Sequence, residues 1–353
     1  MDIFIQVMKC QYSKEQKTVL EEFWLDCECR DFHQRTRETY RSNVRYFLNF
    51  TKVDINSIFE NFYIETNFDE LKKFLLHLRR RKLSQSTING YFAALSTFFG
   101  FLHEYDKTNK NIIPDFRKRY VRMKKKFNHQ SERQIIDVPT MVRLIDEPLR
   151  TKAGQVIKDY CRTVPERDRA IMTLLAKTGL RREELRLLEI NDIDIENGII
   201  YINPEFSKRT NCMGFFDQEA KMILKEYLRW RSSIVRSDNR KLFVTHTGAK
   251  LRKDDIYYIV TYYAKRIGIH DPHGPTMKKY TPICFRHWFT TWLRRNGMSR
   301  EFRKWLRGDA PEGADDWYDH VFAENVKPAY LKLIPKFDEF RTKACETPVQ
   351  CCI

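Results

Sequence analysis

The sequence lacks any long apolar run. No stretch approaches the about 18 consecutive apolar residues of a membrane-spanning helix, and residues 1–14 lack the pattern of a secretory signal. These two absences argue against an integral membrane protein and against a secreted one. We therefore expect a soluble intracellular protein that has no membrane partner.

The nine cysteines lack the spacing of a metal site or of a disulfide framework. Their number is odd, they are scattered along the chain, and none forms a C-x-x-C pair. Neither zinc nor a set of disulfides is indicated, so we expect no metal site. The end of the chain, Cys351-Cys352-Ile353, does not fit the prenylation pattern C-a-a-X, which needs a cysteine where Gln350 stands.

Acidic residues are too few to balance the basic ones. The 353 residues include 64 Lys and Arg against 47 Asp and Glu, a formal net charge of +17. A protein of this charge has a polyanion, above all a nucleic acid, as its leading partner.

The chain is also long for a single hydrophobic core, which favours two domains.

Apolar residues recur at helical spacing in the first third of the chain. Helical patterns begin at about Ser13 and again near Thr36, and a third is expected over residues 68–81. A fourth helix begins at Ser84, which is an N-cap candidate. Four helices within about ninety residues predict a compact bundle with its own core.

Two basic segments accompany this bundle. The first, Arg79-Arg80-Arg81-Lys82, precedes short polar side chains of the types that hydrogen-bond phosphates and base edges, although a solvated loop is the alternative. The second, residues 106–133, predicts an extended basic linker that either tracks a phosphate backbone or serves as a flexible charged spacer. The candidate DNA-binding residues are Arg79, Arg80, Arg81, Lys82, Ser84, Gln85, Thr87, Asn89, Arg117, Lys118, Arg119, Arg122, Lys124, Lys125 and Lys126.

The stretch of residues 169–188 joins two helices through a Thr178-Gly179 break. Gly179 ends the first helix, because glycine takes a positive φ without penalty. Arg181 then stands in the first turn of the second helix, where the helix dipole disfavours a cation and favours an anion. An arginine beside free backbone N–H groups predicts a bound anion such as phosphate, with a solvated helix start as the alternative.

The hydrophobic pattern changes from helical to extended after residue 188. Three strands are expected, and the turn Glu196-Asn197-Gly198 between the first two is a strong hairpin signal. Lys208 then lies at the tip of the second turn. The expected strands are 192–195, 199–202 and 212–216, and the helices that follow are 217–236, 253–267 and 283–295. The chain is thus expected to be mainly α with a small antiparallel β-sheet.

Five motifs resemble, in order and spacing, those of the tyrosine recombinases, the family of phage integrases such as that of phage lambda and of the Xer and Cre recombinases. They are Asp168-Arg169 through Thr178-Gly179-Leu180-Arg181 with Glu184-Leu185, Phe206-Ser207-Lys208, Thr281-Pro282-Ile283-Cys284-Phe285-Arg286-His287, Leu306-Arg307-Gly308-Asp309, and Tyr318-Asp319-His320-Val321. In the N-terminal half, Leu83 to Asn89 resembles the core-binding domain of the family. The resemblance covers residues 13–340.

The resemblance implies an organisation of the chain. A helical SAM-like core-binding domain would span residues 15–105, the basic linker 106–133 and a catalytic domain 134–340. Residues 1–14 have no clear role, and residues 341–353 form a tail. The two domains would close as a clamp on double-stranded DNA, as a homotetramer on two DNA sites and as a monomer or dimer without DNA. The 35 residues after the motif tyrosine would suffice for a helix that docks on a neighbouring protomer.

The resemblance also implies roles for four residues. Arg181 and Arg286 would bind the scissile phosphate, since planar guanidinium groups stay charged and match its oxygens. Tyr318 would attack phosphorus to form a 3′-phosphotyrosine link, and Lys208 would protonate the leaving 5′-oxygen as general acid. Because the phosphotyrosine keeps the bond energy, no ATP, metal or other cofactor is needed. Tyr330 is the reserve nucleophile.

Two positions depart from the family pattern. The histidine that precedes the second arginine falls on Ile283, and the later His or Trp falls on Asp309. Some archaeal and viral members are irregular at the first position, so the chain resembles that branch. Auxiliary roles, such as orienting an arginine or accepting a proton, are assigned to Glu184, His287, Asp309 and His320.

Several functions stay open at this point. A site-specific recombinase or integrase leads, and DNA relaxation like that of type IB topoisomerases would use the same residues. A DNA-binding protein that keeps the fold but has lost cleavage is favoured by Ile283 and Asp309. A generic basic RNA-binding protein would form no covalent adduct with DNA.

Overall fold

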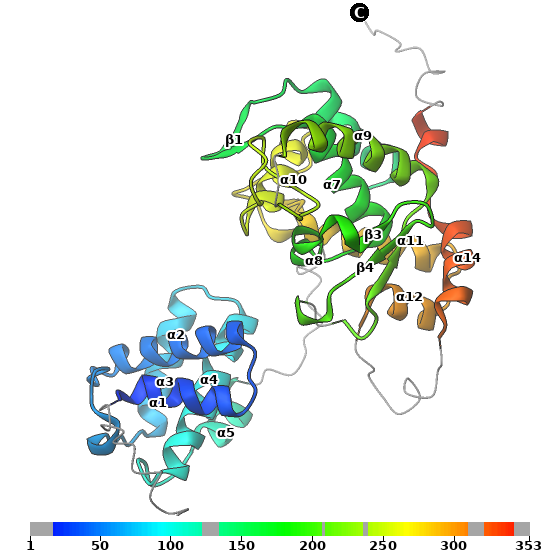
Figure 1. Cartoon of the computed structure of the whole chain (residues 1–353). Coiled ribbons are helices and arrows are strands. Elements are labelled where there is room, and N and C mark those ends of the chain that lie inside the picture. Colours follow the sequence, from blue (N-terminus) through cyan, green and yellow to red (C-terminus); the bar gives the residue numbers. More distant parts are fainter. Residues whose placement is uncertain (1–16, 122–133, 207–208, 236–238, 310–320, 342–353) are drawn as a thin grey trace, which may run out of the picture. The chain divides into compact units, whose positions relative to one another are not determined.

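The chain divides into two compact units, residues 1–127 and 128–353 (Figure 1). A computed structural model describes residues 17–121, 134–206, 209–235, 239–309 and 321–341. None of the helices in these ranges combines the length with the apolar composition that a membrane-spanning helix needs. The first unit is built from helices, and the second combines helices with two small sheets.

Four long helices build the N-terminal unit, as predicted. They are α1 (Val19–Cys29), α2 (Gln34–Phe50), α3 (Phe68–Arg80) and α4 (Gln85–Glu104). Ser84 is the N-cap of α4, and its Oγ accepts a hydrogen bond from the N–H of Thr87 at 3.1 Å. Phenylalanines dominate the core, where the buried rings of Phe47 and Phe74 meet edge to face with centroids 5.1 Å apart.

Part of the predicted extended linker is helical instead. α5 (Ile113–Phe116) and the π-helical turn η2 (Arg117–Val121) follow α4. Ile113, Phe116 and Val121 are buried in the core of the N-terminal unit. The prediction was wrong for this part because it gave more weight to the basic composition than to these apolar residues, which recur near helical spacing and anchor the segment. The remainder of the predicted linker, residues 122–133, lies outside the described residues.

Helix α7 (Pro165–Thr178) forms the centre of the C-terminal unit. It is buried along almost its whole length, and from Ala170 to Ala176 every residue except Thr173 is apolar. Four helices pack against it: α6 (Val138–Asp146), α9 (Gln218–Ile234), α10 (Asp255–Arg266) and α11 (Pro282–Arg295). The end of α7 is thereby fixed within the core, and the segment that follows starts from a rigid point.

The buried charges of α7 have partners. Nε of Arg167 donates to Oδ1 of Asp168 at 2.8 Å, and the hydroxyl of Tyr263 donates to Oδ2 of Asp168 at 2.8 Å. Burial, together with the nearby carboxylate, raises the pKa of Tyr263. A buried ion pair whose remaining atoms are hydrogen-bonded holds its helices in one arrangement. This network therefore fixes α7 against α10.

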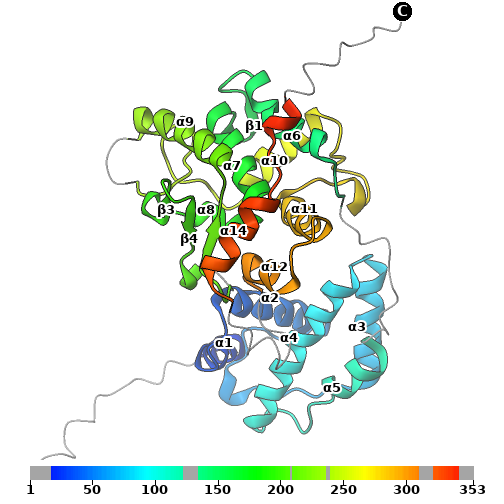
Figure 2. The ribbon, with the colours of Figure 1, turned by 90° about the vertical axis from the view of Figure 1, so that its right-hand side faces the viewer.

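Lys177 joins the C-terminal segment to α7. Its buried Nζ lies 2.5 Å from Oδ2 of Asp217, 2.8 Å from Oε2 of Glu219 and 2.6 Å from the carbonyl oxygen of Pro335. Helix α14 (Ala323–Leu333) packs beside α11 and α12 in an apolar cluster that includes Tyr330 (Figure 2). Within the single chain, α14 thus packs on its own unit through its apolar side chains, and docking of residues after the motif tyrosine on a neighbouring protomer stays a prediction.

The predicted three-stranded sheet is confirmed. Strands β3 (Ile193–Asp194), β4 (Ile199–Tyr201) and β5 (Met213–Phe215) pair antiparallel in sequence order. Asp194 pairs with Ile199 across the predicted turn, where Gly198 takes a φ of 65°. The strands are slightly shorter than predicted, and the hairpin closes through a four-residue loop in which Gly198, but not Asn197, has a positive φ.

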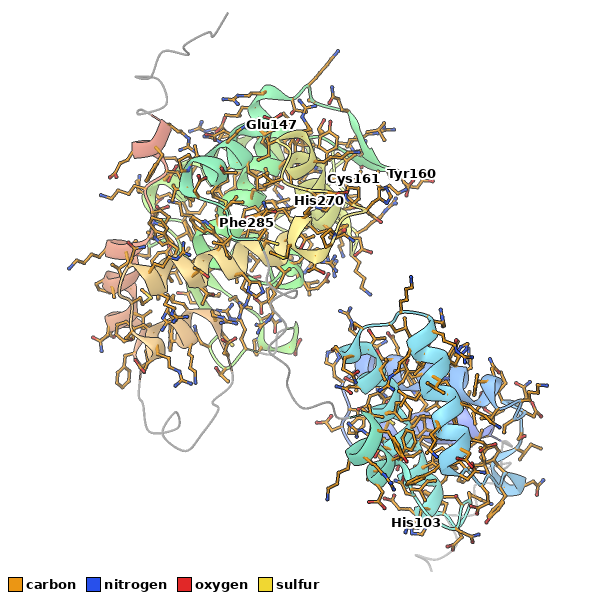
Figure 3. All side chains as sticks on the ribbon, turned by 180° about the vertical axis from the view of Figure 1, so that it is seen from behind. His103, Glu147, Tyr160, Cys161, His270 and Phe285 are labelled. Atoms are coloured by element: carbon orange, nitrogen blue, oxygen red, sulfur yellow. The ribbon has the colours of Figure 1, made fainter. Side chains whose placement is uncertain are left out.

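A second sheet was not predicted. Strands β1 (Val156–Lys158) and β2 (Cys161–Arg162) form a two-stranded hairpin before α7. Figure 3 shows the exposed Tyr160 at its tip, whereas Cys161 is buried against the core of the unit. The strands are too short to give a hydrophobic alternation, so the sequence carries no strand signal here.

Gly179 ends α7 in the left-handed conformation, as predicted. Its φ is 61°, and a Cβ placed on it would lie 2.5 Å from Cδ1 of the buried ring of Phe289. Both the backbone conformation and the available space therefore require glycine. This close contact brings α7 against α11 next to the candidate site.

The variant Gly179→Ala is expected to lower the free energy of unfolding by about 2–4 kcal/mol, from the positive φ and from overpacking against Phe289. Urea denaturation followed by circular dichroism measures the change. The matched control is Gly268→Ala, because Gly268 has a φ of 82° but no atom within 4 Å of its added Cβ. An equal loss in both variants would contradict the role of the Phe289 contact.

Candidate active site

Arg181 follows Gly179 by two residues and is the N-cap of α8 (Arg182–Leu187). Its backbone N–H donates to Oε2 of Glu184 at 2.8 Å, and its Nη1 donates to Oε1 of the same carboxylate at 2.8 Å. The N–H of Arg181 itself is therefore not free to bind an anion, because the side chain of Glu184 reaches back to it. The side chain of Arg181 is still 38% exposed and accessible to a ligand.

Arg286 is buried on α11 and holds separate parts of the chain together. Its Nη1 donates to the carbonyl oxygen of Gly179 at 2.9 Å, and its Nη2 donates to that of Arg307 at 2.7 Å. Burial, together with the nearby cations of Arg181 and Arg307, lowers the pKa of Arg286 to about 10. The guanidinium thus stays protonated at neutral pH, and its two carbonyl contacts fix its position.

Asp309 brings the arginines to one point. It follows α12 (Arg300–Arg307), which ends at Gly308. Its Oδ1 lies 3.0 Å from Nη2 of Arg286 and 3.7 Å from Nη2 of Arg181, while its Oδ2 lies 3.0 Å from Nε of Arg307. Three guanidinium groups from separate segments therefore surround one carboxylate, and the arginines that are far apart in the sequence meet there.

Two arginines of this cluster were missed by sequence reasoning. Buried Arg209 donates from Nη1 to Oε2 of Glu184 at 3.2 Å and from Nη2 to the carbonyl oxygen of Leu306. Arg307 contacts Asp309 as described above. Each stands inside or beside one of the five motifs, and this adjacency was the only signal. Burial lowers the pKa of Arg209, an effect that the carboxylate of Glu184 opposes.

Glu184 is expected to orient the site and not to react. Its buried carboxylate contacts both Arg181 and Arg209. The variant Glu184→Gln keeps the shape but removes the charge, so the two guanidinium groups would shift. A misplacement of about 1 Å can cost up to about a hundredfold in rate.

Single-turnover cleavage of DNA measures this effect, with DNA affinity expected to change far less. The matched control is Glu183→Gln, because Glu183 pairs with Arg182 at 3.3 Å and with Arg186 at 3.0 Å on the same helix. Equal rates for the two variants would count against a positioning role for Glu184.

At the two positions where the family pattern has a histidine, or a histidine or tryptophan, this chain has Ile283 and Asp309. Ile283 lies one turn before Arg286 on α11, with 37% of its surface exposed, and has no group that accepts a proton. His287 is exposed on the same helix. In the described part of the site, Glu184 and Asp309 are thus the carboxylates in contact with the arginines.

Lys208, Tyr318 and His320 lie outside the described residues. Their neighbours, however, are placed. The hydroxyl of Thr210 donates to the carbonyl oxygen of Asp309 at 3.0 Å. This bond joins a residue just after Lys208 to a residue before Tyr318, beside the arginines.

Tyr330 is unsuited to be the reserve nucleophile. It is fully buried on α14, and its hydroxyl donates to the carbonyl oxygen of Lys177 at 2.9 Å. Burial raises the pKa of Tyr330 well above its usual value. A buried, hydrogen-bonded phenol cannot reach a DNA phosphate, so this part of the prediction was wrong.

The two predicted basic segments meet at one end of the N-terminal unit. Nη2 of Arg79 donates to the carbonyl oxygen of Tyr120 at 3.3 Å, and Nε2 of Gln85 donates to that of Val121 at 2.9 Å. We call this region the basic end; its exposed cationic residues are Arg79, Arg80, Arg81, Lys82, Lys118 and Arg119. The contacts place both segments on one surface.

The polar residues at the start of α4 partly bond one another. The hydroxyls of Ser84 and Thr87 lie 2.8 Å apart, and Nε2 of Gln85 donates to Oδ1 of Asn89 at 3.1 Å. Ser84, Thr87 and Asn89 are nevertheless exposed. Arg122, Lys124, Lys125 and Lys126 lie outside the described residues.

The described ranges contain no group of three His, Cys, Asp or Glu side chains that could hold a metal ion.

Comparisons with known proteins agree with these observations. Residues 149–307 match the phage integrase family, and residues 19–106 match the phage integrase N-terminal SAM-like domain. The chain is 28% identical over 288 residues to tyrosine recombinase XerC of Herpetosiphon aurantiacus, an alignment that covers 81% of this chain and 84% of the relative.

Solved structures have the same fold. The Tn1549 transposon integrase in complex with transposon right end DNA is 18% identical, with a TM-score of 0.59 over 93% of this chain and 98% of the other. The XerH recombinase bound to palindromic difH has the same identity and TM-score over 93% of this chain and 85% of the other. With an N-terminal SAM-like domain and a C-terminal integrase domain, the chain belongs to the phage integrase family of tyrosine-type site-specific recombinases.

Proposed function

We propose that the chain is a site-specific DNA recombinase or integrase that cleaves and rejoins strands through a 3′-phosphotyrosine intermediate. One observation carries the proposal. In a chain of this family, the guanidinium groups of Arg181 and Arg286 are held within 3.7 and 3.0 Å of a single anionic oxygen, Oδ1 of Asp309. A DNA phosphate offers oxygens of the same charge to the same groups.

The arginines would act on the transition state. Attack on a phosphodiester builds negative charge on the non-bridging oxygens, and positioned cations stabilise that charge without reorganising during the reaction. Arg286 is fixed by the carbonyl oxygens of Gly179 and Arg307, and Arg181 by Glu184. This rigidity supports a role in transition-state stabilisation for both.

Tyr318 and Lys208 would perform the covalent step. The phenolic oxygen of Tyr318 forms a bond to phosphorus while the bond from phosphorus to the 5′-oxygen breaks, and Lys208 gives the leaving oxygen its proton. A phenol with a pKa of about 10 is a poor nucleophile at neutral pH, so it needs a cationic site or a proton acceptor nearby. His287 and His320 are the acceptors that the sequence offers.

Double-stranded DNA would be the partner of both units. Support comes from the net charge of +17 and from the basic end of the N-terminal unit. The Tn1549 integrase and XerH, which have the same fold, were solved in complex with DNA.

We propose a homotetramer on two DNA sites as the working assembly. Analytical ultracentrifugation with and without DNA would measure it.

Covalent trapping tests the proposed function. Duplexes that the full chain binds are first selected from a random library. Each is then nicked close to the bound site, so that the short fragment with the 5′-hydroxyl diffuses away after cleavage and the strand cannot be rejoined. The expected result is an SDS-resistant protein–DNA band whose protease fragments carry the adduct on Tyr318. Clear binding without an adduct on any selected site would contradict cleavage, and would leave a DNA-binding protein of the same fold.

A further inference from the structure

We propose that Asp309 is an internal substitute for the DNA phosphate. In the chain without DNA, its carboxylate would occupy the anion site formed by Arg181, Arg286 and Arg307, and a phosphate would have to displace it. The inference rests on the proposed function for this site and adds a built-in competitor to it. It also makes Arg307 a third arginine of the phosphate site.

The contacts match those of an anion in its binding site. The two oxygens of Asp309 face three guanidinium groups, at 3.0 Å from Arg286, 3.0 Å from Arg307 and 3.7 Å from Arg181. A carboxylate and a phosphodiester each carry one negative charge spread over two oxygens. The exchange of one for the other therefore preserves the charge of the site, and guanidinium groups accept either.

The backbone holds Asp309 in place. Its N–H donates to the carbonyl oxygen of Lys304 at 3.2 Å, and its carbonyl oxygen accepts from Thr210 at 3.0 Å. Gly308 before it has a φ of 61°, and an added Cβ would lie 2.5 Å from Nε of Arg209. The turn is thus fixed, and only rotation about the side-chain torsions of Asp309 is needed to vacate the site.

Asp309 is an imperfect occupant. Although Nε of Arg307 is 3.0 Å from Oδ2, this buried group has no aligned acceptor among the described residues. The 3.7 Å separation from Arg181 is also too long for a hydrogen bond. A tetrahedral oxyanion presents more acceptor directions than a carboxylate and could satisfy these donors, because buried donors without acceptors are costly. Displacement by phosphate is thereby favoured.

Binding of inorganic phosphate tests the inference, measured by isothermal titration calorimetry on the full chain at low ionic strength. The variant Asp309→Asn removes the competing charge with little change in shape. We expect it to bind phosphate at least about tenfold more tightly, because a close opposite charge no longer screens the arginines. Adding Arg181→Gln to this variant should cancel most of the gain.

The matched control is Asp254→Asn. Asp254 also pairs with an arginine, with its Oδ1 2.9 Å from Nη1 of Arg182, but it does not touch the site arginines named above. It should change the affinity less than about twofold, since a surface ion pair contributes little. An equal gain in this control would overturn the inference, since the effect would then be one of net charge.

Other outcomes also decide the matter. If Asp309→Asn keeps its thermal midpoint but binds phosphate no better than the unchanged chain, the inference is wrong. If that variant does not fold, Asp309→Ser takes its place; the same gain is expected, and its absence would equally overturn the inference. The gain should persist in a Tyr318→Phe background, because phosphate binding needs no tyrosine. Failure of strand cleavage and failure of this inference are thus distinguishable.

Discussion

Tyr318→Phe is expected to abolish the covalent adduct and every recombinant product, with DNA affinity unchanged within about twofold. Phenylalanine has no oxygen to attack phosphorus, so the phosphotyrosine intermediate cannot form and no strand can be exchanged. The loss of one hydroxyl removes at most one hydrogen bond among many contacts to DNA. The adduct is measured on nicked duplexes after denaturation in SDS, and affinity by fluorescence anisotropy.

Tyr330→Phe is the matched control for this experiment. It removes the same hydroxyl from the buried Tyr330, whose bond to the carbonyl oxygen of Lys177 is 2.9 Å long. The adduct should persist, while the free energy of unfolding falls by about 1–3 kcal/mol because a buried acceptor loses its donor. An adduct that survives in Tyr318→Phe and disappears in a folded Tyr330→Phe would contradict the assignment of the nucleophile.

Arg286→Ala is expected to slow strand cleavage by about 10²–10³-fold, the usual cost of losing one positioned group that stabilises the transition state. The same change leaves the carbonyl oxygens of Gly179 and Arg307 without their donor. Each unsatisfied buried group costs about 1–3 kcal/mol, so the thermal midpoint should also fall. Single-turnover cleavage and calorimetric melting measure the two effects.

Arg286→Lys separates charge from geometry. Lysine keeps the cation but cannot reproduce the planar fork that contacts two carbonyl oxygens and Asp309 together. We expect part of the stability to return while cleavage stays slow by at least about tenfold. Cleavage at the original rate in a folded Arg286→Ala would exclude this residue from the reaction.

Local signals predicted much of the fold. The cap at Ser84, the left-handed glycine at position 179 and the Asn-Gly turn each depend on a few neighbouring residues, and the structure has all three where expected. Most of the long helices follow from apolar spacing, whereas α5 in the predicted linker and α12 were not predicted. The candidate site was found from motif order, which brought Arg181 and Arg286 into one hypothesis although 105 positions separate them.

Contacts between distant residues were not predictable in the same way. The burial of Arg209 depends on Glu184 and on the end of α12, and no local pattern marks an arginine as buried. The carboxylate of Asp309 among three guanidinium groups likewise arises from three separate segments. Ile113 and Phe116 lie in a stretch whose composition indicates a linker, yet a neighbouring core accepts them.

The two units have separate hydrophobic cores, and this has a consequence for affinity. Among the described residues, the core of the first unit lies within residues 19–121 and those of the second within 136–337. Each unit can therefore remain folded when the other is destabilised. If both units bind DNA as proposed, their covalent connection sets an effective concentration for the second contact, so the affinity of the whole chain exceeds that of either unit. Avidity, and not a tight fit of either unit alone, would then determine how long the protein stays on its site.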